Sequence, residues 1–500
     1  MRIAPIATLI LTCAAAASAA VIDADPGNFR TKLTTLAAGD TLRLAAGTYT
    51  RSLAIDRLQG RADAWITIAG PTSGARAVFL ANESANTVEI TWSSYVAIEN
   101  LVLDGQHLAG PFGVSAKNGL ANLVHHIRVE NCEIRDYDGN QQTVGISTKT
   151  PTWGWIVRGN RILEAGTGMY FGNSDGSMPF IDGVIEGNLV RNPIGYAVQV
   201  KHQTDRPALA GMPTGPCRTI FRHNVLLKDA RPSPDGDRPN LLLGGFPAAG
   251  AGSSDRYEVY GNLLHGNPRE SLLQAEGRVA IHDNVFVAVA GTAILLRQQN
   301  TPLRLAHVYH NTIHAAGRGI HLGTAATEAS IVVGNLVFAT TPISGAIGTA
   351  SGNLIDAVAN AGAYVTAPST ALGAMDLYPR PGECTGPAVD LAPFAGQVDA
   401  NRDFNGVGKG DRTFRGAYAG SGVNPGWRLA AEAKPIPSGT VPGGPGGGTG
   451  GGATGGGATG GSSGSAGGSG GSGGGCGAGG GLAAVAAGLA LAAAAAARRT

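Results

Sequence analysis

Residues 157–192 read "VRGNRILEAGTGMYFGNSDGSMPFIDGVIEGNLVRN", and this stretch contains one short pattern twice. In "VRGNRILEA" and "IEGNLVRN" an asparagine, Asn160 or Asn188, is flanked by alternating apolar residues. Similar segments return through residues 98–356, with 18 to 38 residues between successive asparagines. These asparagines are Asn100, Asn131, Asn160, Asn188, Asn224, Asn262, Asn284, Asn311, Asn335 and Asn353. Repeats of this length predict a solenoid, in which each repeat forms one coil that packs on its neighbours.

The repeats are predicted to be β-coils. Their apolar residues alternate with period two, and glycines interrupt them before any helical period develops. Stacked coils bring equivalent asparagines together, so we expect an amide ladder along one bend. Because an unpaired buried amide costs about 1 to 3 kcal/mol, the asparagines are interpreted as structural and none as catalytic.

This pattern resembles the right-handed parallel β-helix family over residues 21–430. The resemblance implies an all-β solenoid of about ten to twelve coils. A short helix near Asp25 and Pro26 is expected to cap its N-terminal end, and residues 376–390 and 399–418 are similar to the irregular closing coils of the family. The fold alone does not determine the function, because it hosts lyases, hydrolases, epimerases and adhesins.

The two ends of the chain are predicted to direct export. Residues 1–20 have the charge, apolar run and small-residue site of a signal peptide, with Cys13 leaving a lipoprotein signal as the alternative. Residues 431–475 are a Gly/Ser-rich tether, and residues 476–500 begin at Cys476 and end with a short apolar stretch and two arginines. This tail resembles a myxobacterial-type C-terminal sorting signal, and an ordinary tail anchor is the alternative. Either way the body is expected outside the cytoplasm, attached to the cell envelope at the surface or outer membrane, or otherwise secreted.

Composition restricts the partners. A net charge of +2 gives no electrostatic basis for binding nucleic acid. Only Cys132, Cys217 and Cys384 lie in the predicted solenoid, too few for a disulfide framework, although one pairing among them stays open. We expect a monomer that recognises an acidic polysaccharide, because its strand segments align several cations on one surface.

Eight strand segments align without gaps: 113–118, 145–150, 168–173, 197–202, 240–245, 271–276, 293–298 and 319–324. Their second and fourth positions are mostly apolar and should face inward, so the third and fifth positions should face solvent. The fifth position contains Lys117, Lys149, Lys201 and Arg297, which we call the basic column. Polar neighbours at the third and sixth positions are Ser115, Ser147, Tyr170, Gln199, Asn118, Asn173, His202, Glu276 and Gln298. The column predicts a groove for an acidic polysaccharide; the alternative is solvated lysines that deter edge pairing.

The longest repeats add loops at residues 203–220, 229–239 and 244–256, all expected beside Lys201. Long loops gathered over one part of a solenoid are typical of a walled site. The segment "YAVQVKHQTDRP", residues 196–207, is therefore predicted to form the floor of a cleft.

β-Elimination from a uronate chain needs a base and a cation on the carboxylate. Lys201 is predicted as the base, with a pKa lowered by Arg206 or Arg222, and Arg297 as the bidentate carboxylate ligand. His202 is the alternative base or acid, and Glu276 is predicted to hold a metal or to position sugar hydroxyls.

The remaining predicted substrate contacts are Lys117, Lys149, Tyr170, Gln199, Arg206 and Arg222. The arrangement is similar to β-helical polysaccharide lyases of the alginate and chondroitin kind, which implies calcium as a possible cofactor, although no motif of those enzymes is intact. Residues 399–405 alternate Asp and Asn like a calcium loop, with a capping turn as the alternative. A non-catalytic adhesin or glycan-binding solenoid remains the alternative function, in which these side chains are ordinary surface cations, a turn histidine and a solvated glutamate.

Overall fold

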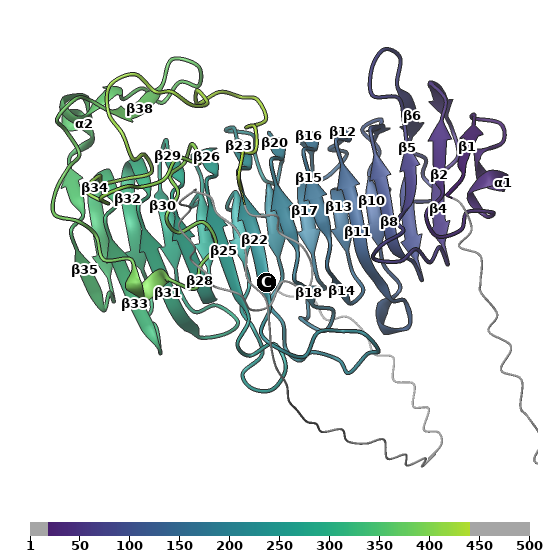
Figure 1. Cartoon of the computed structure of the whole chain (residues 1–500), viewed down its shortest axis with the longest axis horizontal. Coiled ribbons are helices and arrows are strands. Elements are labelled where there is room, and N and C mark those ends of the chain that lie inside the picture. The colour runs from purple at the N-terminus through teal and green to yellow at the C-terminus, as the bar shows by residue number, and fades with distance from the viewer. Residues whose placement is uncertain (1–18, 441–500) are drawn as a thin grey trace, which may run out of the picture. The chain divides into compact units, whose positions relative to one another are not determined.

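The computed structural model describes residues 19–440 of the chain. Most of the expected signal peptide, most of the tether and the Cys476 segment lie outside the described residues. Within them the chain winds into a right-handed parallel β-helix, which confirms the predicted fold class (Figure 1). Each coil contributes up to three strands, so the helix has three walls.

The first wall is a 15-stranded sheet of parallel strands. Its strands are β1 (Val21–Ala24), β2 (Thr41–Leu44), β5 (Ile66–Ala69), β8 (Ser94–Glu99), β11 (Val124–Glu130), β14 (Thr152–Trp153), β15 (Ile156–Arg158), β18 (Phe180–Ile181), β19 (Val184–Glu186), β22 (Arg218–Arg222), β25 (Arg256–Tyr260), β28 (Gly277–His282), β31 (Leu303–Tyr309), β33 (Ala329–Val333) and β35 (Thr349–Ser351).

The second and third walls belong to one 21-stranded sheet, because β32 (Thr312–Leu322) and β34 (Leu336–Gly345) bend across both. The rest of the second wall is β3 (Gly47–Tyr49), β6 (Ala77–Leu80), β9 (Leu101–Asp104), β12 (Glu133–Tyr137), β16 (Arg161–Ala165), β20 (Leu189–Arg191), β23 (Val225–Lys228), β26 (Leu263–Gly266), β29 (Val285–Ala288) and β36 (Leu354–Asp356). The rest of the third wall is β4 (Leu53–Asp56), β7 (Val88–Thr91), β10 (Val114–Ala116), β13 (Val144–Thr148), β17 (Thr167–Phe171), β21 (Val198–Val200), β24 (Leu241–Leu243), β27 (Leu273–Ala275) and β30 (Thr292–Leu296).

The core runs through the middle of the three walls. Alternate strand residues point inward and stack on their equivalents in the next coil, as Val114, Ile146 and Met169 do. At the N-terminal end Asp25 accepts hydrogen bonds from the backbone of Gly27 and Asn28 and so starts α1 (Phe29–Leu33). Phe29 packs edge-on against Tyr49 and Phe79 and closes the core, which confirms the predicted cap.

The predicted asparagine ladder is present from Asn160 to Asn353. Each member accepts from the backbone N–H and, along the ladder, the side-chain amide of the member before it, as Asn188 does from Asn160 at 3.0 Å for both donors. The predicted first members are wrong by one residue, because Cys132 and not Asn131 donates to Asn160. Asn100 and Asn131 instead occupy the preceding left-handed position, with φ of 60° and 54°, where other coils use glycine, histidine or aspartate. Asparagine tolerates this conformation, so the sequence pattern alone does not separate the two roles.

The C-terminal segment, residues 357–440, differs from the predicted closing coils. It runs back along the outside of the solenoid, and Figure 1 shows it passing over the green and teal strands. It contains η2 (Val358–Asn360), α2 (Ala361–Tyr364), the antiparallel pair β37 (Val365–Ala367) and β38 (Asp376–Pro379), and η3 (Ala392–Phe394). Its apolar residues cover outward side chains of the second wall, including Leu227, Leu263 and Phe338. We call this segment the strap.

The strap continues past residue 430, the predicted end of the solenoid domain. The Lys434 amine is buried and donates to the carbonyl oxygens of Gly261 and Phe404. The alternation of polar residues at 399–405 belongs to this packing, because the Asp403 carboxylate accepts from the backbone N–H groups of Asn405, Val407 and Ala419. That geometry favours the capping turn over the calcium loop. Among residues 19–440 no helix is long and apolar enough to cross a membrane.

Candidate active site

The basic column exists, and one of its eight strands has a different register from the predicted one. The pairings from β10 through β13, β17, β21 and β24 align the predicted segments, as do those of β30 and β32. In β27, however, Leu273 and not Leu272 lies opposite Leu241. Both leucines are fully buried, so alternation did not fix the phase of that strand. The shift moves Glu276 to the fifth position, inside the column, and Gln274 to the third.

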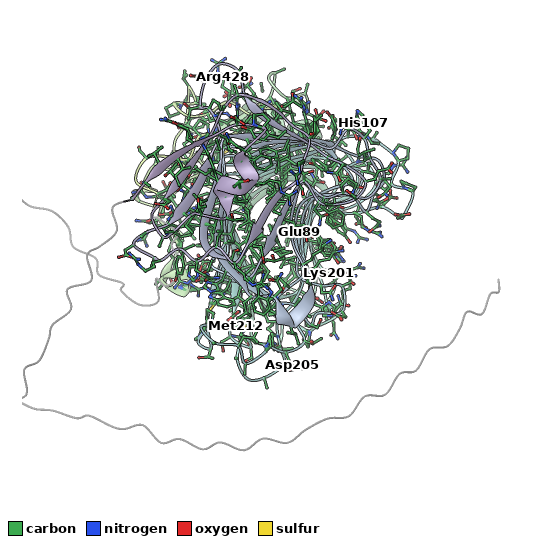
Figure 2. All side chains as sticks on the ribbon, turned by 90° about the vertical axis from the view of Figure 1, so that its right-hand side faces the viewer. Glu89, His107, Lys201, Asp205, Met212 and Arg428 are labelled. Atoms are coloured by element: carbon green, nitrogen blue, oxygen red, sulfur yellow. The ribbon has the colours of Figure 1, made fainter. Side chains whose placement is uncertain are left out.

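The cations of the column share the outer surface of the third wall. The pKa of Lys149 is lowered by burial and by the charge of Lys117, its neighbour in the preceding coil. The Lys149 amine also lies 5.3 Å from the ring centroid of Tyr170, and the Lys117 amine lies 3.7 Å from the carboxylate of Glu89. In the view along the solenoid, Glu89 and Lys201 lie on the same side, away from His107 and Arg428 (Figure 2).

A shallow, solvent-open pocket lies at the middle of the column, and its empty space, open solvent included, is about 390 Å³. All four predicted catalytic residues line it: Lys201, His202, Glu276 and Arg297. Gln199 lines it as well, whereas Lys117, Lys149 and Tyr170 lie on coils closer to the N-terminus. The remaining lining residues are Tyr196, Val200, Leu242, Leu243, Gly244, Gln274, Ala275, Gln299 and Asn300.

Lys201 lies between two glycines of the column, Gly172 and Gly244. A Cβ on Gly172 would lie 3.3 Å from the Lys201 Cβ, and a Cβ on Gly244 would lie 2.2 Å from the backbone nitrogen of His202. The glycines therefore let the neighbouring coils approach closely. The side chain is half-buried, and burial together with the charge of Arg238 lowers the pKa of the Lys201 amine, against an opposing effect of Glu276.

His202 follows at the edge of the pocket, with its ring against Gly176. Burial lowers its pKa, and the charge of Lys201 lowers it further, while Glu276 and Asp175 act in the opposite direction. The imidazole is therefore neutral at neutral pH. Its buried Nδ1 has no hydrogen-bond partner within the described part of the chain.

Glu276 has a structural task. Its side chain is 3% exposed, and Oε1 accepts from the backbone N–H of Gly245 at 3.0 Å. Oε2 accepts from the backbone N–H groups of three successive residues, Gln299, Asn300 and Thr301, at 2.9, 2.7 and 2.9 Å. The carboxylate is thus saturated by the loop that borders the pocket and is not arranged to hold a metal. Within residues 19–440 no group of three or more His, Cys, Asp or Glu is placed to bind a metal ion.

Arg297 is the exposed cation on the far side of the pocket, three coils from Lys201. The stacked coils predict about 14 Å between these two positions. With the Gln274 amide oxygen turned toward the guanidinium, that oxygen accepts from Arg297 Nε and Nη2 at 2.8 Å each. The Gln274 contact orients the guanidinium on the pocket wall.

Arg206 and Arg222 do not lie beside Lys201, contrary to the prediction. The side chain of Arg206 is buried in an ion pair with Asp255, whose Oδ1 also accepts from the backbone of Cys217. This pair fastens the 203–217 loop. Arg222 is buried on the first wall, where it donates to Glu186 at 2.6 Å and to the Tyr260 hydroxyl at 2.9 Å. Each arginine belongs to a buried network with residues of another coil, and an alignment of strand segments does not reveal such a network.

The structure adds one pocket-lining residue that the sequence pattern did not predict, Tyr196, and a cation that packs against it, Arg238. The side chain of Arg238, from the 229–239 loop, lies 5.7 Å from the ring centroid of Tyr196. Burial raises the pKa of the Tyr196 hydroxyl, with Arg238 acting in the opposite direction. Tyr196 is the first residue of the predicted cleft floor, residues 196–207, but it precedes the aligned strand positions, so the strand pattern does not predict where its side chain points. The 229–239 loop reaches this region through Arg238, whereas no described residue of 203–217 lines the pocket, so the predicted cleft walls stay a prediction.

No family model and no curated protein matches the sequence. The structure is similar to that of an alginate lyase from Paenibacillus sp. str. FPU-7, with a TM-score of 0.41 and 17% identity over 68% of this chain and 99% of that chain. A GH136 lacto-N-biosidase from Eubacterium ramulus gives a TM-score of 0.41 and 10% identity over 68% of each chain. The A-module of the mannuronan C-5 epimerase AlgE4 from Azotobacter vinelandii gives a TM-score of 0.39 and 16% identity over 64% of this chain and 91% of that chain. The architecture described above defines the chain as a right-handed parallel β-helix protein, and the function proposed below is argued from its own site.

Proposed function

We propose that this protein cleaves a uronate-containing polysaccharide by β-elimination in the Lys201 pocket. The observation that supports this most directly is the position of Lys201, a half-buried amine of lowered pKa that shares one pocket with Arg297 and Tyr196. The basic column leads to the pocket from the N-terminal side, and its cations suit a polyanion that lies along the stacked coils. A polymer bound to these cations lies parallel to the solenoid axis, because the aligned strands stack along that axis.

Lys201 and Arg297 both line the pocket, so in the proposed reaction their side chains act on one uronate although their strands lie three coils apart. Arg297 binds the uronate carboxylate and stabilises the charge that develops when C5 loses its proton. The neutral Lys201 amine takes that proton. The electrons of the C5–H bond form the C4–C5 double bond, and the C4–O4 bond breaks. Tyr196 donates its proton to the departing O4, because a hydroxyl of raised pKa is protonated at neutral pH. The tyrosinate then recovers a proton from the Lys201 ammonium through solvent.

The two other predicted residues have different tasks in this proposal. Neutral His202 lies beside Lys201 and contributes a hydrogen-bonding group for sugar hydroxyls. Glu276 holds the 299–301 loop, and we derive no step through calcium, because the saturated carboxylate does not fit a calcium ligand.

The test uses the purified protein with alginate, chondroitin and pectate as separate substrates. Cleavage by β-elimination produces an unsaturated uronate, which is followed by its ultraviolet absorbance. Lys201→Ala is expected to lower the rate by about a hundredfold or more. Lys32→Ala, which removes a half-buried lysine of the N-terminal cap far from the pocket, is the matched control and should leave the rate unchanged.

The rate should rise with pH as Lys201 loses its proton, with a midpoint below the ordinary lysine value of 10.5. Unchanged turnover in Lys201→Ala would remove Lys201 from the mechanism. Salt-sensitive binding of one polymer without cleavage would instead establish the alternative, a glycan-binding solenoid.

We further propose that the protein acts at the cell surface, exported through residues 1–20 and retained by the segment that begins at Cys476. The compositions of the two ends support this proposal. Replacing Cys476 by Ala in the producing cell should release the protein into the medium if the sorting interpretation is correct. Retention of the variant in the envelope would favour the tail anchor.

A further inference from the structure

Trp92 lies at the N-terminal end of the basic column. It directly follows β7, and the β7–β10 register places Glu89 opposite Ser115 and Ile90 opposite Ala116. Continued by two residues, this register puts Trp92 opposite Asn118, at the sixth position of the aligned segments. That is the position that His202 occupies four coils further along. Trp92 and His202 therefore lie on the same edge of the third wall, about 19 Å apart at 4.8 Å per coil.

The backbone holds Trp92 in an unfavourable conformation. Its φ is 48°, in the left-handed region, which costs an L-residue with a bulky side chain about 1 to 2 kcal/mol. Side chains from both neighbouring coils fix it there. The Trp92 N–H donates to Asn122 Oδ1, and the Trp92 carbonyl accepts from Gln59 Nε2. The buried Asn122 amide also donates to the carbonyl of Lys117, so the same group ties Trp92 to the first cation of the column.

This arrangement exposes the indole rather than burying it. The residue is 41% exposed, in contrast to Trp153 and Trp155, which are buried. An exposed large aromatic ring held by a strained and doubly fastened backbone indicates a binding function, because neither packing nor local backbone preference explains it.

We propose that Trp92 is a distal subsite that stacks on a pyranose ring of the same acidic polysaccharide. This inference rests on the proposed function for the identity of the polymer. Lys117 and Lys149 lie between Trp92 and the pocket, so a chain that follows the column meets carboxylate-binding cations first and a flat apolar face at its end. Successive coils lie about 4.8 Å apart, which is close to the length of one sugar unit, so the span corresponds to about four sugars. Trp92 thus favours long chains over short ones.

The experiment compares binding of a uronate oligomer of about two sugars with one of about eight sugars, because only the longer one spans the four coils. Binding is measured by calorimetry in the Lys201→Ala background, and turnover in the otherwise unaltered protein. Trp92→Asn removes the ring while asparagine tolerates the left-handed backbone, so folding is preserved. Val423→Asn, at a position 90% exposed on the strap, is the matched control.

Trp92→Asn is expected to weaken binding of the long oligomer by about tenfold and to leave the short one unchanged. Trp92→Phe should retain most of the affinity, and Val423→Asn all of it. If the protein cleaves the polymer and Trp92→Asn binds and cleaves both lengths normally, the subsite is refuted while the proposed function stands. If nothing is cleaved but the length-dependent loss appears, the subsite stands and the lyase function fails. Absence of binding to every uronate oligomer would overturn both.

Discussion

Removing the Glu276 carboxylate should loosen the loop that borders the pocket. Four backbone N–H groups depend on this one side chain, three of them on successive residues of the 299–301 loop. A hydrogen bond to a charged group contributes about 1.5 to 3 kcal/mol. In Glu276→Ala the three loop donors can turn to water, because the loop is at the surface, but the Gly245 N–H stays buried without a partner. Eliminating a buried charge offsets part of the loss, so we expect a net destabilisation of about 3 kcal/mol.

The sharpest assay is amide hydrogen exchange. The amides of Gln299, Asn300 and Thr301 should exchange about a hundredfold faster in Glu276→Ala, which corresponds to about 2.7 kcal/mol of lost local protection. Glu276→Gln keeps one acceptor but presents an amide donor toward Gly245, so its effect should be intermediate. Glu328→Ala, which breaks an exposed ion pair with Arg278, is the control and should change stability by less than about 0.5 kcal/mol.

The same substitution affects the base. The negative charge of Glu276 raises the pKa of Lys201, so Glu276→Gln should move the pH–rate profile of any cleavage to lower pH. Unaltered exchange of the three loop amides in Glu276→Ala would refute the structural role of Glu276.

Three further predictions concern the floor, the ladder and the strap. Gly244→Ala should lower turnover by more than about tenfold, because the new Cβ would lie 2.2 Å from the backbone nitrogen of His202 and would displace the Lys201 backbone. Gly110→Ala is the control and should leave turnover unchanged, because its Cβ would meet no atom within 4 Å. Asn262→Ala should lower the free energy of unfolding in denaturant by about 3 to 4 kcal/mol, because Asn262 donates to Phe221, Tyr260 and Asn284 and accepts from Asn224. Asn353→Ala, at the half-buried end of the ladder, should lower it by only about 1 kcal/mol. Equal losses of stability in the two variants would contradict the ladder argument. Burial lowers the pKa of His282 to about 3 and the pKa of His310 well below 6.5, and the charge of Lys409 on the strap lowers both further. The unfolded chain therefore binds more protons than the folded chain below pH 6.5, and stability is lost as pH falls, by about 2 kcal/mol at pH 5 for His282. His310→Asn, which suits the left-handed backbone at this position, should lessen that loss in urea unfolding followed at several pH values, and an unchanged pH dependence would count against it.

The third wall shows how far strand patterns predicted the site. Alternation correctly aligned Lys117, Lys149, Lys201 and Arg297 on one outer surface, because parallel coils repeat the same inward and outward phase. It failed for Glu276, where adjacent Leu272 and Leu273 are both buried and leave the phase undetermined.

Long-range packing explains the other differences. Arg206 pairs with Asp255, 49 residues away in the chain, and Arg222 with Glu186, 36 residues away, so neither guanidinium reaches the pocket. Arg238 reaches Tyr196 from a loop whose path no local pattern describes. The strap likewise follows the outer apolar face of the second wall, because residues such as Leu263 and Phe338 point outward there and require cover.

The sequence by itself determined the coil, its period and the line of asparagines, because these depend on residues that repeat and that interact only with their equivalents one coil away. It also determined that cations gather on one wall. Only the tertiary structure decided which of those cations share a pocket, which carboxylate is saturated by backbone donors, and where the C-terminal strap lies. Those features depend on contacts between loops of unequal length, and the energy of such contacts is set by burial and geometry rather than by any repeating pattern.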